Sequence, residues 1–490
     1  MDYFVKYIGV DILKADLERE YGGFQLVIQV IKSEPFPIQK DVFFNSYKKR
    51  IENETHSVFL ESGRGGTKTI AASNPLAVVQ STENGLQVDW RDGRQDLHIG
   101  EPLQLVEQLL LQYRVDAPSD SFYGGAIGFI AYDYVRKIEE LPSIAKDDLQ
   151  IPDIYFYIVD CWTVLDVEYE KATVMKLSTS DIDVEELAKS WQTDCSKSNF
   201  NHTTAQAVKN DESRLVSMTC EQFKDAVGQI QHYIAQGDVF QVNLSVRQAQ
   251  KMDVDPIIMY EALRTFNPSP YMAYIASPHF SIVSGSPELL LQKYGENLST
   301  RPIAGTRPRG KDDAEDMALA NELIHHEKER AEHIMLVDLE RNDLGRVSEY
   351  GTVHVDEFMV IEKYSHVMHI VSNVRGKVSK DKSNAEIIRA VFPGGTITGA
   401  PKIRTMEIIE ELEPVRRGLY TGSIGWIGFN GDIELNIVIR TSFIKNGVAY
   451  IQAGAGVVID SVPEREYIES LNKAKALWQA KSMAEGVKEL

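Results

Sequence analysis

Residues 325–346 constrain this chain more strongly than any other stretch, and they read HHEKERAEHIMLVDLERNDLGR. From Leu323 onward, apolar residues recur near the 3.6-residue period, which predicts a helix. The turn-forming residues at 342–345 predict where that helix ends. Glu329 and Glu332 are three residues apart, so both carboxylates leave one face of the helix.

A second pair of glutamates, Glu466 and Glu469, has the same spacing near the C-terminus. Two such pairs on two helices can converge on one hard divalent cation, and Mg²⁺ suits carboxylate ligands while it keeps water or substrate oxygens in its shell. A glutamate pair on a helix is also common on an ordinary solvated face. The spacing alone leaves both interpretations open.

The composition is that of a globular protein with more than one ordinary core. A chain of 490 residues favours two domains or one large fused pair of sheets. Its 52 basic and 72 acidic residues give a net charge of −20, which argues against nucleic acid or an anionic membrane surface as a partner. The three cysteines form no disulfide framework, and we find no signal peptide and no apolar run of membrane-spanning length. The expected location is the cytoplasm.

The pattern along the chain predicts an N-terminal domain, a linker and a larger C-terminal domain. Strand-like runs dominate up to about residue 165. Residues 178–216 are rich in Ser, Thr, Asp, Lys and Asn, and they are the best candidate for a linker. We therefore expect domains at 1–177 and 217–482.

The second domain carries polar residues within predicted strands and glycine-rich loops. Thr219 fits the N-cap of a helix that Gly237 ends, and a strand follows at 239–247. Residues 392–402 form a glycine-rich loop that leads into a helix. Another strand is predicted to start at 365, and its two histidines, three residues apart, point to opposite faces and are not a metal pair.

Residues 433–441, IELNIVIRT, predict one strand with apolar or small side chains at its odd positions. Asn436 and Arg440 then share the opposite face. An arginine in such a strand either reaches water at a sheet edge or meets a bound carboxylate, because burying it unpaired is costly. Both interpretations stay open. The stretch QAGAGVV at 452–458 then brings bare backbone close to a ligand or to a packed strand.

Seven stretches in one order along the chain resemble the chorismate-utilising enzymes. They are QVNLS at 241–245, GSPE at 285–288, RPIAGT at 301–306, AEHIMLVD at 331–338, FPGGTITGAPK at 392–402, IRT at 439–441 and AGAG at 453–456. The resemblance implies a large α+β fold of two packed sheets with peripheral helices, and an active site between the sheets.

The resemblance also implies roles for the residues at matching positions. Four carboxylates would surround Mg²⁺, which would hold the ring carboxylate of chorismate: Glu329, Glu332, Glu466 and Glu469. Glu288 would be the general acid that protonates the departing C4 hydroxyl, with His369 against the reacting ring and Thr306 in the matched RPIAGT stretch. Expelling hydroxide from a dianion requires such a proton donor, neutralised charge and exclusion of water.

A further group would bind the enolpyruvyl carboxylate of chorismate. Its members are Tyr420, Arg440 and the backbone around Gly454, Ala455 and Gly456, and Lys473 would add positive charge to the same pocket. Lys473 follows Glu469 by four residues, so both lie on one helical face.

Gln241 distinguishes between members of the family. The water-using synthases resemble this chain but carry a lysine base where Gln241 stands, and a glutamine cannot activate water. Ammonia is already a nucleophile, so the resemblance implies an ammonia-using member. It implies a separate glutaminase subunit as the partner that supplies ammonia, because these 490 residues contain no glutaminase domain.

Ala304 leaves two kinds of ammonia-using member open. Many aminodeoxychorismate synthases carry a lysine here, which attacks C2 before ammonia enters C4, whereas anthranilate synthases carry alanine. The stretches at 241–245, 404–409 and 412–425 nevertheless look most like aminodeoxychorismate synthases of the bacillus type. We therefore expect component I of such a synthase, with anthranilate synthase component I as the alternative.

Leu60, Glu61 and Ser62 resemble the tryptophan site of the family's first domain, which is only structural in some members. They mark a candidate regulatory pocket and raise a third interpretation, a non-catalytic binding protein. Both glutamate pairs and Glu288 are intact, which favours an enzyme.

Overall fold

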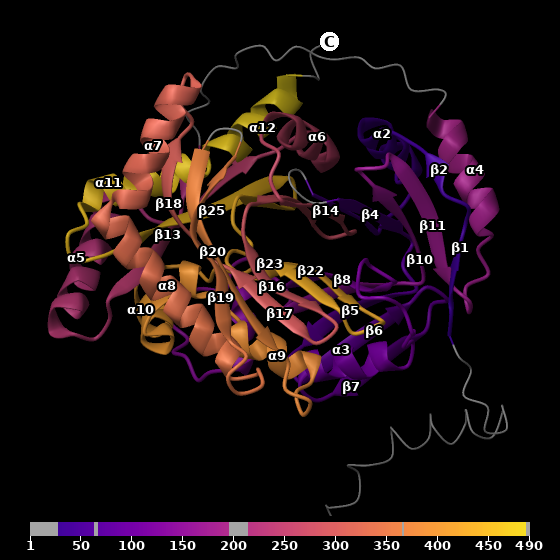
Figure 1. Ribbon diagram of the computed structural model, residues 1–490, viewed down its shortest axis with the longest axis horizontal. Coiled ribbons are helices and arrows are strands. Elements are labelled where there is room, and N and C mark those ends of the chain that lie inside the picture. Colours follow the sequence, from indigo (N-terminus) through magenta and orange to yellow (C-terminus); the bar gives the residue numbers. More distant parts are fainter. Residues whose placement is uncertain (1–27, 63–66, 196–213, 365–366, 487–490) are drawn as a thin grey trace, which may run out of the picture.

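The computed structural model describes residues 28–62, 67–195, 214–364 and 367–486. In this part of the chain, two large sheets of 13 and 12 strands pack against each other, with helices around the outside (Figure 1). Neighbouring strands run antiparallel in both sheets. The predicted α+β class with two packed sheets is confirmed.

The first sheet combines strands from both ends of the chain. Its members are β1 (Val30–Lys32), β2 (Phe36–Pro37), β3 (Ser57–Glu61), β4 (Lys68–Ser73), β10 (Cys161–Asp166), β11 (Lys171–Leu177), β12 (Leu215–Val216), β13 (Gln241–Lys251), β14 (Tyr271–Ala276), β15 (Ser281–Ser286), β21 (Gly399–Ala400), β24 (Thr441–Lys445) and β25 (Val448–Val457). They follow the order β1-β11-β10-β4-β3-β14-β15-β24-β25-β13-β12, with β2 beside β11 and β21 beside β13.

The second sheet also combines strands from both ends of the chain. Its members are β5 (Ala77–Thr82), β6 (Gly85–Trp90), β7 (Gln95–Ile99), β8 (Gly125–Ile130), β9 (Ile154–Val159), β16 (Leu289–Tyr294), β17 (Asn297–Arg301), β18 (Ile303–Pro308), β19 (His354–Lys363), β20 (Val367–Lys377), β22 (Ser423–Gly428) and β23 (Ile433–Asn436). Their order is β18-β20-β17-β16-β23-β22-β8-β9-β5-β6-β7, with β19 beside β20.

The helices lie on the outer faces of the sheets (Figure 1). They are α2 (Lys40–Arg50), α3 (Pro102–Leu111), α4 (Val184–Cys195), α5 (Cys220–Gln236), α6 (Pro256–Phe266), α7 (Asp313–His325), α8 (Glu327–Gly345), α9 (Asn384–Val391), α10 (Lys402–Leu412), α11 (Pro463–Lys473) and α12 (Lys475–Gly486). As predicted, Thr219 caps α5 and Gly237 ends it with φ at 85°. Within the described ranges, no helix has the length and apolar character needed to cross a membrane.

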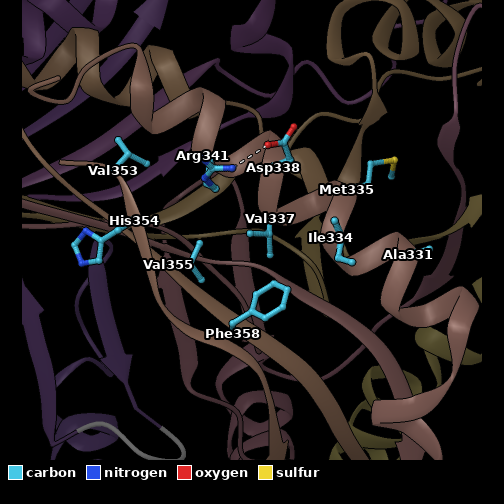
Figure 2. A pocket seen from close by; sticks show the side chains of 10 residues that line it. All are labelled: Ala331, Ile334, Met335, Val337, Asp338, Arg341, Val353, His354, Val355 and Phe358. Carbon is cyan, nitrogen blue, oxygen red and sulfur yellow. Dashed lines mark hydrogen bonds and ion pairs between the residues drawn. The ribbon is translucent and has the colours of Figure 1, made fainter. Parts of the chain in front are cut away.

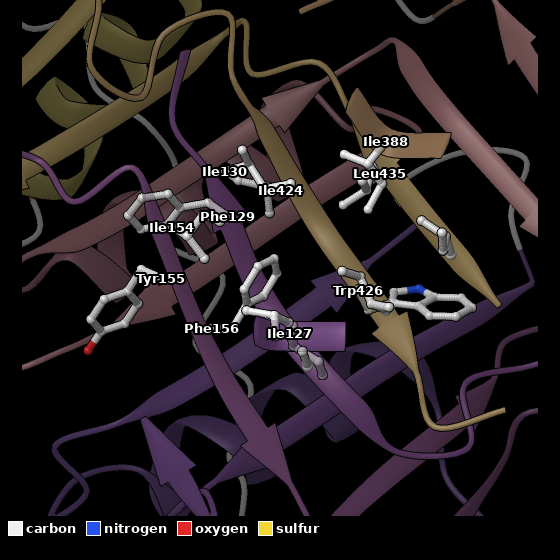
Figure 3. Close-up of a cluster of buried hydrophobic side chains, with 14 of the residues drawn as sticks. Ile127, Phe129, Ile130, Ile154, Tyr155, Phe156, Ile388, Ile424, Trp426 and Leu435 are labelled. Atoms are coloured by element: carbon white, nitrogen blue, oxygen red, sulfur yellow. The ribbon is translucent and has the colours of Figure 1, made fainter. Parts of the chain in front are cut away.

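The main hydrophobic core fills the space between the sheets (Figure 3). The adjacent strands β8 and β22 are buried along their whole length, and Phe129 and Trp426 are among the side chains they contribute. A β-carbon on Gly128 would come 2.0 Å from the carbonyl oxygen of Tyr155 on the paired strand β9. Glycine at this position therefore permits close approach of two core strands.

The predicted helix around 325–346 begins later than the periodicity suggested. Leu323 belongs to α7, and the extended residue His326 separates α7 from α8. The His326 ring caps α8, because its Nδ1 accepts a hydrogen bond from the Glu329 amide at 3.4 Å. Apolar residues at helical spacing continue from α7 into α8, so the pattern does not show the break at His326.

The predicted single strand at 433–441 is wrong. β23 ends at Asn436 and β24 begins at Thr441, and Arg440 between them has φ at +52°. Arg440 and Asn436 therefore do not share a strand face. The Gly285 amide donates to the Arg440 carbonyl at 3.0 Å, which helps to hold this turn beside β15. His366, one of the two histidines in the neighbouring prediction, lies outside the described residues.

Candidate active site

The start of β13 pairs with the end of β25, where Gly454 and Gly456 leave the backbone without side chains. We call this surface the glycine floor. Asn243 faces Gly456, and Ser245 faces Gly454, across the antiparallel pair. A β-carbon on Gly456 would come 2.3 Å from Gln241 Nε2, and one on Gly454 would come 2.6 Å from Asn243 Oδ1. The amide side chains of Gln241 and Asn243 thus lie over these glycines, and only glycine leaves room for them.

Gln241 connects this floor to the first glutamate pair. Its Nε2 donates to Glu332 Oε1 at 2.7 Å. Burial raises the pKa of Glu332, the hydrogen bond from Gln241 lowers it, and the neighbouring Glu329 raises it again. Both carboxylates of the pair leave α8 on the side that faces β13 and β18, as their spacing predicted.

Three of the four glutamates contact a side-chain N–H donor, and the fourth, Glu466, is hydrogen-bonded to Ser461. Glu329 Oε1 lies 3.3 Å from the Arg307 guanidinium, and Glu469 Oε1 lies 2.9 Å from Lys473 Nζ. Gln241 is the donor to the third, Glu332. Each of these N–H donors stabilises the negative charge of its carboxylate, as a bound cation would.

The two glutamate pairs face the same pair of lysines. Lys328 and Lys473 both lower the pKa of Glu332 and that of Glu466, although burial leaves both values raised. Among the described residues, no three His, Cys, Asp or Glu side chains gather closely enough to hold a metal ion. The donor set nevertheless fits Mg²⁺ in kind, because all four residues offer carboxylate oxygens, and burial raises the pKa of Glu332 and that of Glu466.

Glu288 lies in the connection between β15 and β16, sealed from solvent at 4% exposure. Burial raises its pKa to about 7, against the opposing effects of the Thr396 hydroxyl, the Ile303 amide and Lys473. Its Oε1 has no hydrogen-bond partner within the described ranges. A carboxyl group with this pKa is protonated below about pH 7 and can then donate its proton to a substrate.

His369 on β20 is held by the facing strand β18. Its Nδ1 lies 3.1 Å from Thr306 Oγ1 and 3.0 Å from the Gly305 carbonyl oxygen. Acceptance by this carbonyl requires a proton on Nδ1, which leaves Nε2 as an acceptor. Burial lowers the pKa of His369 to about 4, so the ring is neutral at physiological pH.

Ala304 lies at the centre of these contacts. The preceding residue, Ile303, contacts Glu288 through its amide, and the following residue, Gly305, contacts His369. A β-carbon on Gly305 would come 3.1 Å from Glu329 Oε2, so this part of β18 also lies against α8. Ala304 itself is 8% exposed.

Tyr420 and Arg440 lie near each other. Burial lowers the pKa of Arg440, while Tyr420 and Glu469 raise it, so both of these residues are within its electrostatic reach. The Arg417 guanidinium lies 5.4 Å from the centre of the Tyr420 ring. Lys473 Nζ donates to the Gly454 carbonyl at 2.9 Å and ties α11 to the glycine floor.

The candidate regulatory residues Leu60, Glu61 and Ser62 line a different cavity, of about 500 Å³, between the sheets. Glu61 is fully engaged there, because Arg264 and Lys40 both pair with its carboxylate, at 2.7 and 3.1 Å. Pro287 and Leu289 line the same cavity on either side of Glu288.

A further cavity of about 620 Å³ lies on the outer face of α8, against β19 (Figure 2). Its apolar wall includes Ile334 and Phe358, at 50% and 54% exposure, and Asp338 pairs with Arg341 at its rim. None of the predicted site residues lines it. It is separate from the group of residues around Glu288.

The structure adds residues that the sequence did not single out. Arg417 is almost completely buried, pairs with Glu413 and donates to the Asn243 backbone carbonyl at 2.6 Å. The one signal in the sequence was a charged pair, Glu413 and Arg417, beside the apolar run that forms β22. Asn243 was visible only as part of the QVNLS stretch.

The comparisons with known proteins agree with this arrangement. Residues 55–479 match the family model described as chorismate binding enzyme. The chain is 51% identical over 459 residues to aminodeoxychorismate synthase component 1 of Bacillus subtilis, covering 92% of this chain and 96% of that protein. It is 40% identical over 487 residues to anthranilate synthase component 1 of Acetivibrio thermocellus, covering 95% and 96%.

A solved structure supports the same assignment. Anthranilate synthase component I from Streptococcus pneumoniae is similar with a TM-score of 0.74 and 34% identity, over 84% of this chain and 92% of that one. The resemblance inferred from the motifs is confirmed, and the chain belongs to the chorismate binding enzyme family.

Proposed function

We propose that this protein is component I of an aminodeoxychorismate synthase, which replaces the C4 hydroxyl of chorismate with an amino group from ammonia. The observation that carries the proposal is that the site contains a buried acid and, in place of a base, a neutral amide. Glu288 has a pKa of about 7 and can protonate a departing hydroxyl, whereas Gln241 offers no base to activate water. The similarity to the Bacillus subtilis protein supports the same reaction.

The chain's own residues would bind, orient and protonate the substrate. Glu288 would give its proton to the C4 oxygen, and neutral His369, fixed by Thr306 and Gly305, would lie against the ring. Tyr420, Arg440 and the backbone of Gly454, Ala455 and Gly456 would bind the enolpyruvyl carboxylate. Lys473 would reduce the negative charge that the dianion brings to both sides of the pocket.

Glu329, Glu332, Glu466 and Glu469 would hold Mg²⁺. When bound, the ion would neutralise the ring carboxylate of chorismate and assist departure of the hydroxyl. Arg307 and Lys473 now contact Glu329 and Glu469, so a bound metal ion would compete with these two ion pairs for the carboxylates.

A glutaminase subunit is the proposed source of ammonia, and a cytoplasmic location is proposed with it. The name component 1, carried by the relatives, supports a multi-part enzyme. Residues 1–177 and 217–482, joined by 178–216, remain the proposed domains, and each of them contributes strands to both sheets. The cavity at Leu60, Glu61 and Ser62 remains a proposed regulatory pocket.

Anthranilate synthase component I is the second candidate, and Ala304 favours it. An alanine at the centre of the site cannot form a covalent adduct at C2 of the ring, so ammonia itself can attack C2. Attack at C2 followed by loss of pyruvate gives anthranilate, whereas C4 amination retains the enolpyruvyl group.

One assay tests both candidates. The purified protein is incubated with chorismate, Mg²⁺ and ammonium, with and without an added aminodeoxychorismate lyase, and products are separated and identified. We expect 4-aminobenzoate only when the lyase is present. Anthranilate formed without lyase, and no 4-aminobenzoate with it, would establish the second candidate instead.

A further inference from the structure

Two buried amide oxygens over the glycine floor have no hydrogen-bond partner in the described part of the chain: Gln241 Oε1 and Asn243 Oδ1. Gln241 is 5% exposed, and its Nε2 is committed to Glu332. This contact fixes the orientation of the amide, because the reverse orientation would set two oxygens against each other. An unpaired buried carbonyl oxygen costs free energy, so such a pair calls for a ligand that donates hydrogen bonds.

The two oxygens belong to one face of one strand. Positions 241 and 243 of β13 point to the same side of the sheet, while Val242 and Leu244 point away into a separate apolar cluster with Phe223. Gly456 and Gly454 lie beneath the two amides and leave room for both of them on this face.

Neighbouring side chains hold the backbone at Asn243 in position. Arg417 donates to its backbone carbonyl at 2.6 Å, and the next residue on this face, Ser245, donates through Oγ to Glu413 at 2.7 Å. The strand that carries both amides is therefore held by a buried ion pair. The backbone that carries the two oxygens is therefore fixed in position.

The chemistry of this pair selects its ligand. Two carbonyl oxygens beside the carboxylate of Glu332 repel a carboxylate and attract a donor. Ammonia has three N–H groups and one lone pair. If two N–H groups are bound by the two oxygens, the lone pair stays free to point away from the floor toward a substrate.

We propose that Gln241 Oε1 and Asn243 Oδ1 form the binding site for ammonia in this enzyme. The inference rests on the proposed function, because it assigns a place to the nitrogen nucleophile of that reaction. It makes Asn243 a catalytic residue, because Asn243 would contact a reactant. Gln241 would then bind ammonia as well as being unable to activate water.

The test is steady-state kinetics with ammonium chloride as the varied nitrogen source and chorismate at saturation. Asn243→Leu removes one acceptor, and the KM for ammonia should rise about five- to tenfold, with the KM for chorismate within about twofold of wild type. Asn243→Asp keeps an acceptor oxygen at the same place, so its KM for ammonia should not exceed the wild-type value.

Gln241→Met gives an independent measurement if Asn243→Leu does not fold. It should raise the KM for ammonia in the same way. Because this change also removes the hydrogen bond to Glu332, the Mg²⁺ concentration for half-maximal activity is measured as well, and the KM for ammonia is compared at saturating Mg²⁺. Gln248→Met is the matched control. Gln248 is a buried amide on the other face of β13, where its Oε1 accepts from Trp478 at 3.1 Å, so both KM values should stay unchanged.

Two outcomes would overturn the inference. An unchanged KM for ammonia in Asn243→Leu and Gln241→Met would show that the oxygens hold only water. A rise confined to the KM for chorismate would assign the amides to the chorismate site. Failure of the wild-type protein to aminate chorismate at all would instead remove the proposed function, so the two failures are distinguishable.

Discussion

Arg417 and Glu413 form a two-point ion pair in the interior, with Nε and Nη2 donating to the two carboxylate oxygens at 3.0 and 2.8 Å. Side-chain exposure is 1% for Arg417 and 3% for Glu413. The same guanidinium donates to the carbonyls of Ile397 and Asn243. This pair therefore joins the glycine-rich loop after α9 to β13 at the site.

The first prediction concerns that pair. Arg417→Met leaves the Glu413 carboxylate buried without its partner, so the free energy of unfolding should fall by about 3–5 kcal/mol. Denaturant unfolding measures the change. Arg416→Met is the control, because Arg416 is more exposed and should contribute less than about 1 kcal/mol. Equal losses in both variants would contradict a special role for Arg417.

The second prediction concerns the metal. Glu329→Gln and Glu469→Gln remove charge but keep shape, so Mg²⁺-dependent turnover should be lost while the circular dichroism spectrum stays the same. Glu464→Gln, an exposed change on α11, serves as the control and should retain activity. Full activity in either of the first two variants would refute the metal assignment.

The third prediction is a pH dependence. The pKa of Glu288 is raised to about 7, so the acid is protonated below this pH and loses its proton as the pH rises through it. Amination should therefore decline above about pH 7 once the free ammonia concentration is held constant, and Glu288→Gln should be about 10²- to 10⁴-fold slower. A rate that stays level through pH 8 would exclude Glu288 as the proton donor.

The same shift has a consequence for stability. A carboxyl group with a higher pKa in the folded state than in the unfolded chain stabilises the fold at low pH, and that contribution is lost as the pH rises from about 4.5 to about 7. Glu288→Gln stays neutral at all pH values. The variant should therefore gain stability relative to wild type above pH 7, as measured by urea unfolding at several pH values.

The fourth prediction concerns water. Without ammonia, the wild-type protein should form neither isochorismate nor salicylate from chorismate, because Gln241 cannot take a proton from water. Chromatography of a reaction with Mg²⁺ and no nitrogen source provides the measurement. Accumulation of either compound as a main product would show that another group activates water.

The fifth prediction concerns Ala304. We expect Ala304→Lys to place an amine between Glu288 and His369 and to change the ratio of C4 to C2 amination products, as measured with and without lyase. Ala304→Ser is too short to reach the ring and should keep the wild-type ratio. An unchanged ratio in the lysine variant would show that this position does not control where nitrogen enters.

The sequence predicted features that depend on local spacing and missed those that depend on packing. The capping of α5 by Thr219 and the shared face of Glu329 and Glu332 follow from residues three or four apart. The turn at Arg440 could not be predicted, because an apolar run resembles a strand until its neighbours compel a positive φ. The role of Asn243 could not be predicted either, because it depends on contacts with Gly454 and Arg417, which are far away in the sequence.

The pairing of β3 with β14 and of β8 with β22 makes the two ends of this chain inseparable. Leu60 lies opposite Ala273, and Gly128 lies opposite Gly425, so each sheet is completed only when residues more than two hundred positions apart meet. A fragment from either end would carry an open strand edge, which other chains can extend into aggregates. Co-expressed fragments could assemble with each other, because each one supplies the edge that the other lacks.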